Sequence, residues 1–195
     1  MKLGATRQAI HDALTWSYQQ RGESGLVEYI KYMTKIEKTY RANNGQMTAD
    51  FLEAGWILAA VNNQKSHIAA WLRYCYGAID NEFDALSVSG WLFMENYLGS
   101  AKGNGIDRHK ELCRCAVDDF RLRMRRSKAM PSEAYASAMQ VDSGNFARDW
   151  GKKRDTLIDQ VQSLDFEGVG KVSIVVKQLR GEGDFINLTA ALQSA

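Results

Sequence analysis

The side chains that could bind a charged ligand are concentrated in one stretch of this sequence. Between Lys102 and Arg154 there are thirteen Lys or Arg residues and seven acidic residues, so the segment carries +6 in a 195-residue chain of net charge +2. A local excess of cations raises the electrostatic potential over one surface and can neutralise phosphates. The distribution therefore favours a polyanionic partner, such as a nucleic acid, at this segment.

Two runs within this stretch are candidates for contact with DNA. The run 121–128 has no acidic residue and supplies the candidates Arg121, Arg123, Arg125, Arg126 and Lys128. The run 145–154 supplies Asn145, Arg148, Lys152, Lys153 and Arg154. An asparagine amide can pair bidentately with adenine and an arginine guanidinium with guanine, so Asn145 and Arg148 are predicted to read bases.

Both runs also have an ordinary structural interpretation. The first run could be a solvated helix face, partly an ion-pair ladder in which Asp118 lies one turn after Arg114. The second could belong to a helical hairpin that binds nothing. These alternatives stay open at the level of the sequence.

Residues suited to catalysis or metal binding are scattered. His11, His67 and His109 lie far apart, and the three cysteines, two of them in a Cys-x-Cys pair, cannot form a tetrahedral zinc set by themselves. We therefore expect no metal, no cofactor and no enzyme activity. One enzymatic hypothesis remains, because Asp118 and Asp119 are paired acids beside bases, a combination that nucleases use.

The elements that must position these residues are predicted to be helices, since the chain has one proline, Pro131, and little clustering of β-branched residues. Apolar residues at helical spacing predict helices over 3–22 and 26–40 and central helices over 51–61 and 68–76, the latter ended by Gly77. The basic stretch predicts a long helix from residue 107, a short helix over 132–139, a corner at 141–144 and a second long helix. The fold class is thus all-α, an irregular helical bundle with a C-terminal helix-turn-helix-like basic unit.

The domains predicted from these patterns are a helical core over 1–98 that could dock a protein, a linker over 99–105, a basic DNA-binding unit over 106–164 and an extension over 165–195. Residues 83–94 have the shape of a second helix-turn-helix, with its corner at 86–89. Because no Lys or Arg lies between Arg73 and Lys102, that unit suits a protein partner better than DNA. For 169–179 we favour a helix over a strand, because no other segment offers a strand partner.

Two parts of the sequence resemble a known family. Residues 130–135 (Met-Pro-Ser-Glu-Ala-Tyr) and 145–153 (Asn-Phe-Ala-Arg-Asp-Trp-Gly-Lys-Lys) resemble the C-terminal part of the late-gene antiterminator Q proteins of lambdoid phages. There, a Met-Pro…Ala-Tyr helix precedes a helix with a tryptophan and basic residues. Residues 53–77 are similar to another branch, in which an aromatic pair and a glycine follow an apolar helix. The zinc-binding Cys-x-x-Cys pairs of one branch are absent, so its metal site is not carried over.

The resemblance implies a sequence-specific DNA-binding transcription regulator that loads onto promoter-proximal paused RNA polymerase and makes it read through terminators. It places the DNA role on Arg148, Lys152, Lys153 and their neighbours. The implied partners are double-stranded DNA and bacterial RNA polymerase, with no small-molecule substrate. The alternative is an all-helical adaptor or inhibitor that acts by protein contact alone.

The apolar segments are too short for a membrane span, the longest being residues 54–61. The N-terminus has no apolar core of the kind that a secretion signal needs. We therefore expect the protein in the cytoplasm of the bacterial host and away from membranes.

Overall fold

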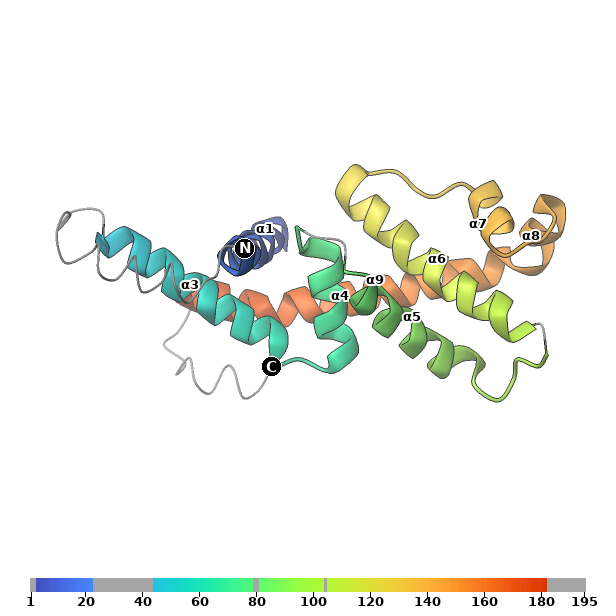
Figure 1. The fold of residues 1–195 in the computed structure, drawn as a ribbon, viewed down its shortest axis with the longest axis horizontal. Coiled ribbons are helices and arrows are strands. Elements are labelled where there is room, and N and C mark those ends of the chain that lie inside the picture. The colour runs from blue at the N-terminus through green and yellow to red at the C-terminus, as the bar shows by residue number, and fades with distance from the viewer. Residues whose placement is uncertain (1–2, 23–43, 79–80, 104, 182–195) are drawn as a thin grey trace. The chain divides into compact units, whose positions relative to one another are not determined.

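The computed structural model describes residues 3–22, 44–78, 81–103 and 105–181, and its regular secondary structure in these ranges is α-helical (Figure 1). The all-α fold class is therefore confirmed. The chain divides into two compact units, one formed by residues 1–64, 76–80 and 168–195, the other by 65–75 and 81–167. None of the helices in the described ranges combines the length and the apolar character that crossing a membrane requires.

The first unit is built around α1 (Leu3–Gly22) and α3 (Asn44–Asn62), which pack against each other. The predicted end of α1 at Gly22 is confirmed. α3 buries one side, with Ile57 and Val61 almost inaccessible, while Leu52 on another side is 55% exposed. The prediction of a central helix over 51–61 therefore fits one side of α3 and not the side that carries Leu52. The helix predicted over 26–40 lies outside the described residues.

The C-terminal part of α9 (Gly151–Leu179) completes the first unit. It buries valines at helical spacing, among them Val172, Val175 and Val176. The Gln64 side-chain amide donates a hydrogen bond to the Gly168 carbonyl at 3.1 Å. The choice of helix over strand for 169–179 is thus confirmed, whereas residues after 181 lie outside the described part of the chain.

The second unit has Trp71 of α4 (Ser66–Tyr76) in its core. The indole is fully buried, donates to the Asp165 carboxylate at 3.1 Å and lies 5.6 Å from the Phe120 ring. α4 ends just before Gly77 and buries most of its side chains, as predicted. A buried indole needs a hydrogen-bond partner, and Asp165 supplies it.

α5 (Glu82–Tyr97) is one continuous helix that packs on α6 (Gly105–Arg126). The helix-turn-helix shape predicted for 83–94, with a corner at 86–89, is therefore wrong. The Asn81 side chain caps the first turn by accepting from the Phe83 amide at 3.1 Å. Val88 and Leu92, one turn apart, are buried on the side that the helix presents to the core. The helical spacing of the apolar residues thus outweighs the turn tendency of the sequence Leu-Ser-Val-Ser, and these four residues are helical.

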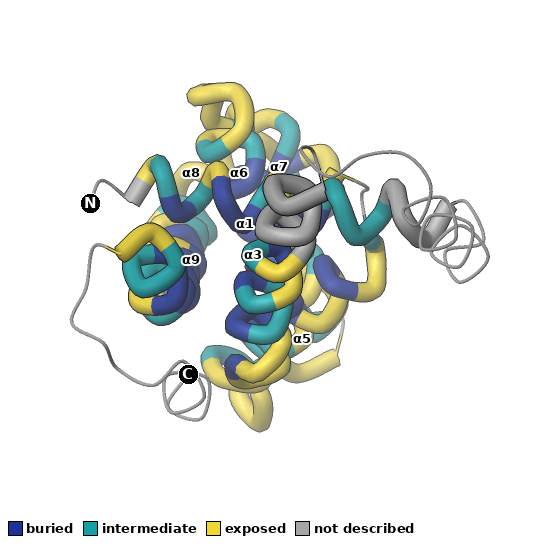
Figure 2. Tube along the Cα trace, turned by 90° about the vertical axis from the view of Figure 1, so that its left-hand side faces the viewer, coloured by how far each residue is buried: buried dark blue, intermediate teal, exposed yellow. Residues whose placement is uncertain are grey.

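The remaining helices of the second unit are α7 (Ser132–Ala138), α8 (Ser143–Asp149) and the first part of α9. Residues 99–103, within the predicted linker 99–105, connect α5 to α6 inside this unit. Buried and exposed residues occupy different sides of α9, as the burial colours in Figure 2 show. This helix therefore has the amphipathic pattern of a packed helix along its whole length.

Candidate nucleic-acid interface

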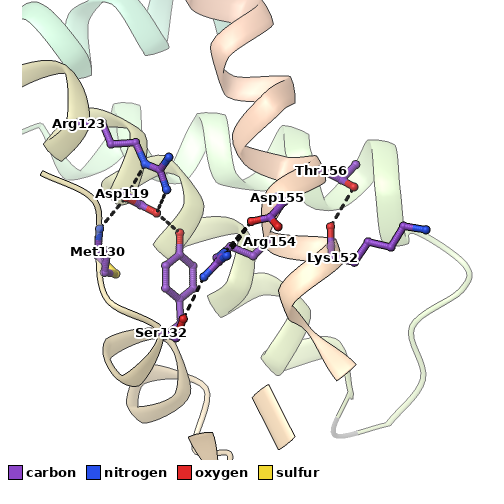
Figure 3. Close-up of polar contacts among 9 residues, drawn as sticks. Asp119, Arg123, Met130, Ser132, Lys152, Arg154, Asp155 and Thr156 are labelled. Carbon is purple, nitrogen blue, oxygen red and sulfur yellow. Dashed lines mark hydrogen bonds and ion pairs between the residues drawn. The ribbon is translucent and has the colours of Figure 1, made fainter. Parts of the chain in front are cut away.

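A buried carboxylate, Asp119, holds the connection between α6 and α7 (Figure 3). It accepts hydrogen bonds at 3.0 Å from both Nε and Nη2 of Arg123, one turn further along α6. It also accepts from the Met130 backbone amide at 2.7 Å and from the Tyr135 hydroxyl at 2.9 Å. One side chain thus joins α6, the loop after it and α7, and the four donors stabilise a charge that burial would otherwise disfavour.

The same contacts set the ionisation of this cluster. Burial acts to raise the pKa of Asp119, but the hydrogen bonds from Arg123, Met130 and Tyr135 outweigh it and hold the pKa below its usual value. The pKa of Tyr135 is raised, first by burial and then by the neighbouring Asp119 charge. The carboxylate is therefore ionised and the phenol protonated at neutral pH, which is the pairing that the hydrogen bond requires.

Two arginines of the run 121–128 are attached to α4. The Arg121 side chain is 9% exposed, and its guanidinium lies 4.2 Å from the centre of the Tyr74 ring, a cation–π contact. The Nε of Arg125 donates to the Cys75 carbonyl at 2.9 Å, in the last turn of α4, where a cation is favoured. These guanidiniums bind parts of their own unit.

The run 121–128 contains no acidic residue, but Asp119, which lies just before it, pairs with Arg123. Their separation by one helical turn is visible in the sequence. Arg126 and Lys128, by contrast, are exposed and form no hydrogen bond or ion pair within the described part of the chain. They are the cations of this run that a ligand can reach without breaking an internal contact.

α7 and α8 form a helical hairpin with a defined corner. α7 ends with Gln140 in the left-handed region, at φ 53°, and with a hydrogen bond from the Val141 amide to the Ala136 carbonyl at 2.9 Å. Asp142 then caps α8 by accepting from two backbone amides of its first turn, at 2.9 and 3.2 Å. The predicted corner at 141–144 is thus close to the one that the chain forms.

The prediction of one long helix after this corner is wrong. α8 ends at Asp149 and α9 begins at Gly151, with Trp150 between them at φ −122° and ψ −19°. The Trp150 ring lies 4.8 Å from the ring of His109 on α6, and glycine has a low helix propensity. The packing of Trp150 on α6 therefore coincides with Gly151, a residue that favours a helix break. As a result, Arg148 lies on α8, whereas Lys152 and Lys153 lie on α9. That α7 and α8 dock on DNA as a helix-turn-helix stays a prediction.

The exposed side of α8 carries the two side chains predicted to read bases. Nη2 of Arg148 donates to the Asn145 side-chain oxygen at 3.1 Å. The same guanidinium makes a two-point contact with Asp149, at 2.8 and 2.9 Å. Because of these hydrogen bonds the pKa of Asp149 is lowered and that of Arg148 raised. All three side chains are exposed, so water competes with the pair and a ligand can replace Asp149.

Lys153, in the first turn of α9, lies against aromatic rings. Its Nζ is 4.5 Å from the centre of the Trp150 ring and 3.3 Å from His109 Nε2. His109 Nδ1 donates to the Gly105 carbonyl at 2.6 Å, which leaves Nε2 as the acceptor for the ammonium. The Tyr97 ring covers His109 at 4.3 Å. Lys153 is exposed, and its contact with His109 of α6 holds the ammonium group in one position.

The cations on either side of Lys153 differ from each other (Figure 3). The Lys152 side chain extends away from the surrounding polar groups and is exposed. Arg154 donates to Ser132 at 3.1 Å, pairs with Asp155 at 2.8 Å and lies over the Tyr135 ring at 5.8 Å. Lys152 is therefore available to a ligand, whereas Arg154 ties the start of α9 to α7.

The accessible cations form two groups at different ends of α6. His109 marks the end beside α8 and α9, and Arg126 lies at the other end, about 25 Å away at the usual helical rise. Arg108 and Lys110, which flank His109 and are exposed, add positive charge to the first end. Sequence reasoning did not assign them to DNA binding, because the contact of His109 with Trp150 is not visible in the sequence.

The structure gives the enzymatic alternative no further support. Asp118 accepts a hydrogen bond from the Tyr74 hydroxyl, and Arg114 approaches Glu82, at 3.8 Å, in place of the predicted partner Asp118. Cys113 and Cys115 are buried thiols, and burial raises the pKa of each to about 12. Within the described ranges, His, Cys, Asp and Glu side chains do not gather in threes as they would around a metal ion.

The described part of the second unit is all-helical, and Arg148, Lys152 and Lys153 are exposed on it. A model of the phage antitermination protein Q family matches residues 41–183, which is most of the chain. The chain therefore belongs to this family of antitermination factors, which is a regulatory and not an enzymatic family, as the sequence resemblance indicated. Searches among curated proteins and among solved structures found no match.

Proposed function

We propose that the protein binds duplex DNA in a sequence-specific manner through α8 and the first turn of α9. The observation that carries this proposal is the placement of Arg148, Lys152 and Lys153 at one end of the second unit, exposed and inside the segment that matches the antitermination family. Cations in such a position can neutralise phosphates without disturbing the core.

The side chains of this surface differ in their proposed roles. Lys152 and Lys153 contact phosphates, which fix the orientation of the protein without reading sequence. Asn145 and Arg148 read base edges in the major groove, once Arg148 has exchanged Asp149 for a base. The contact of Arg148 with Asn145 keeps both polar groups together before DNA arrives. Arg126 and Lys128, at the far end of α6, add a second phosphate contact.

The remaining predicted DNA contacts are not part of this proposal. Arg121, Arg123, Arg125 and Arg154 each bind a group of the protein itself. Recruiting them to phosphates would break contacts that hold α4, α6, α7 and α9 together. The proposed surface is therefore smaller than the basic segment of the sequence.

RNA polymerase is the proposed target of the DNA-bound protein. Family membership supports this step, since an antitermination factor must alter a transcribing polymerase. The protein would load onto polymerase paused near the promoter, in the cytoplasm of the bacterial host, and make it read through terminators.

The test is selection of bound fragments from a random duplex pool at near-physiological salt. Wild-type protein should enrich one motif, and the Arg148→Glu/Lys152→Glu variant should lose it while keeping the helical circular-dichroism spectrum of the wild type. Lys65→Glu, at an exposed position just before α4 and away from the proposed surface in sequence, is the control and should enrich the same motif. Absence of a motif for the wild type would contradict sequence-specific binding and favour an adaptor that works by protein contact alone.

A further inference from the structure

The solvent side of α5 carries four large apolar side chains. Phe83 is 84% exposed, Leu86 49%, Met94 60% and Leu98, just after the helix, 68%. Their spacing, with the exposed Gly90 between them, brings them to one side of the helix. Single exposed apolar residues are common, but an aligned series of four is typical of an interaction surface. We call these four residues the α5 stripe.

The opposite side of α5 is already buried. Ala85, Val88 and Leu92 lie in the core of the second unit, where α5 packs on α6. A surface helix normally has polar residues opposite its buried side, and a helix that is apolar all round is normally covered all round. α5 departs from this pattern, because the α5 stripe lies opposite its buried side and is apolar, so the stripe lacks the cover that such side chains normally have.

The charges beside the α5 stripe select the kind of partner. Glu82 and Glu95 are exposed on this helix, and no Lys or Arg occurs between Arg73 and Lys102. Arg114 of α6 approaches Glu82 at 3.8 Å, but this pair is exposed and therefore weak, so a cation of a partner can replace Arg114. Asp84 is already bound by Arg73, at 2.7 Å. DNA phosphates would be repelled here. A second copy of the chain would bring the same acidic helix against this one, which places like charges at the contact.

We infer that the α5 stripe is the docking surface for a protein that offers an apolar groove edged with Lys and Arg side chains. Phe83 and Met94 insert into the groove as anchors, in the manner of an amphipathic helix bound in a groove. Glu82 and Glu95 meet the basic edge and exclude partners with acidic edges. The inference rests on the proposed function only for its choice of probe, a purified bacterial RNA polymerase core enzyme.

The test measures binding of the full-length protein to this polymerase and to duplex DNA in parallel. Phe83→Glu and Met94→Glu should each weaken polymerase binding about tenfold or more, the size of effect seen when an interface anchor is lost. Ile174→Glu is the matched control, because Ile174 is also an exposed apolar residue, at 47%, but lies on α9 outside the stripe. It should change the dissociation constant less than about twofold. DNA affinity should be the same in all four proteins.

Each other result counts against the inference in an identifiable way. Polymerase binding that survives both stripe substitutions overturns it, and so does a wild type that binds DNA but not polymerase. A wild-type dimer that the stripe variants convert to monomers, with polymerase binding kept, would assign the stripe to self-association. Absence of DNA binding by the wild type would instead contradict the proposed DNA role, since the stripe is not expected to contact DNA.

If Phe83→Glu lowers the melting temperature, Phe83→Ala, which only shortens an exposed side chain, replaces it and should weaken polymerase binding about fivefold.

Discussion

Basic side chains lie near both ends of α6, but the two groups make different contacts. Towards its C-terminus, Arg121, Arg123 and Arg125 are held by Tyr74, Asp119 and Cys75, so their cations stabilise the fold. Beside its N-terminus, Arg148 of α8 and Lys152 and Lys153 of α9 are exposed, and Lys153 is oriented by His109 and Trp150.

The difference shows that the number of basic residues does not identify a nucleic-acid surface. The run 121–128 is the denser in cations, yet three of its five are occupied within the protein. The run 145–154 contains one acid, Asp149, but Lys152 and Lys153 remain accessible. What a charge contacts, and not how many charges lie together, decides whether phosphates can use it.

The largest expected effect is the loss of stability in Asp119→Ala. The substitution leaves the Tyr135 hydroxyl and the Met130 amide without their acceptor and Arg123 without its counter-charge. We expect the free energy of unfolding, measured with urea, to fall by about 2–4 kcal/mol. Asp159→Ala, at an exposed position of α9, is the control and should cost less than about 0.5 kcal/mol. If both substitutions lowered the free energy of unfolding by the same amount, Asp119 would not have the stabilising role that we assign to it.

The second prediction concerns the stability of the protein at low pH. Because the pKa of Asp119 is lowered in the folded protein, its contribution to stability is fully present above the unfolded pKa of about 4 and is lost as the pH falls from there through the folded value. Urea unfolding at pH 7, 4 and 3 should therefore show a smaller decline in Asp119→Asn than in the wild type. Parallel declines for the two proteins would mean that other carboxylates account for the acid sensitivity.

A smaller effect separates neighbouring arginines of the same run. Arg125→Ala removes the hydrogen bond to the Cys75 carbonyl at the end of α4 and should lower the free energy of unfolding by about 1 kcal/mol. Arg126→Ala, which removes an exposed cation, should leave it within about 0.5 kcal/mol of the wild type. DNA affinity should respond in the opposite order, falling for Arg126→Ala and not for Arg125→Ala.

The smallest effect is a gain of DNA affinity in Asp149→Asn. The substitution releases Arg148 from an exposed ion pair and removes a negative charge from the proposed DNA surface. Fluorescence anisotropy with a duplex should show affinity rising by roughly two- to fivefold, with the melting temperature unchanged. A fall in affinity would mean that Asp149 orients Arg148 for DNA and does not compete with it.

The helices could be predicted from the sequence where apolar spacing and glycine agree. α1 ends at Gly22, α4 ends before Gly77, and residues 169–179 are helical, all as local rules indicate. The rules failed where a distant contact matters. The break at Trp150 accompanies its packing on His109, and the continuity of α5 reflects the side that it buries.

The candidate site was predictable in part. The pairing of Asp119 with Arg123 is visible as a one-turn spacing, but the burial of Asp119 depends on Met130 and Tyr135, which reach it only in the folded chain. Similarly, Arg154 is indistinguishable from Lys152 and Lys153 in the sequence. Its contact with Ser132 is what separates it from them.

The measurement that tests the central claim most directly is the salt dependence of DNA affinity for Lys152→Gln/Lys153→Gln and for Arg121→Gln/Arg125→Gln. Each phosphate contact contributes roughly 0.9 to the slope of the logarithm of affinity against the logarithm of salt concentration. We predict that the first double variant loses about 2 from this slope and keeps its stability, whereas the second keeps the slope and loses stability. A slope that falls in the second variant and not in the first would mean that Arg121 and Arg125 contact phosphates and that Lys152 and Lys153 do not, which would contradict the account.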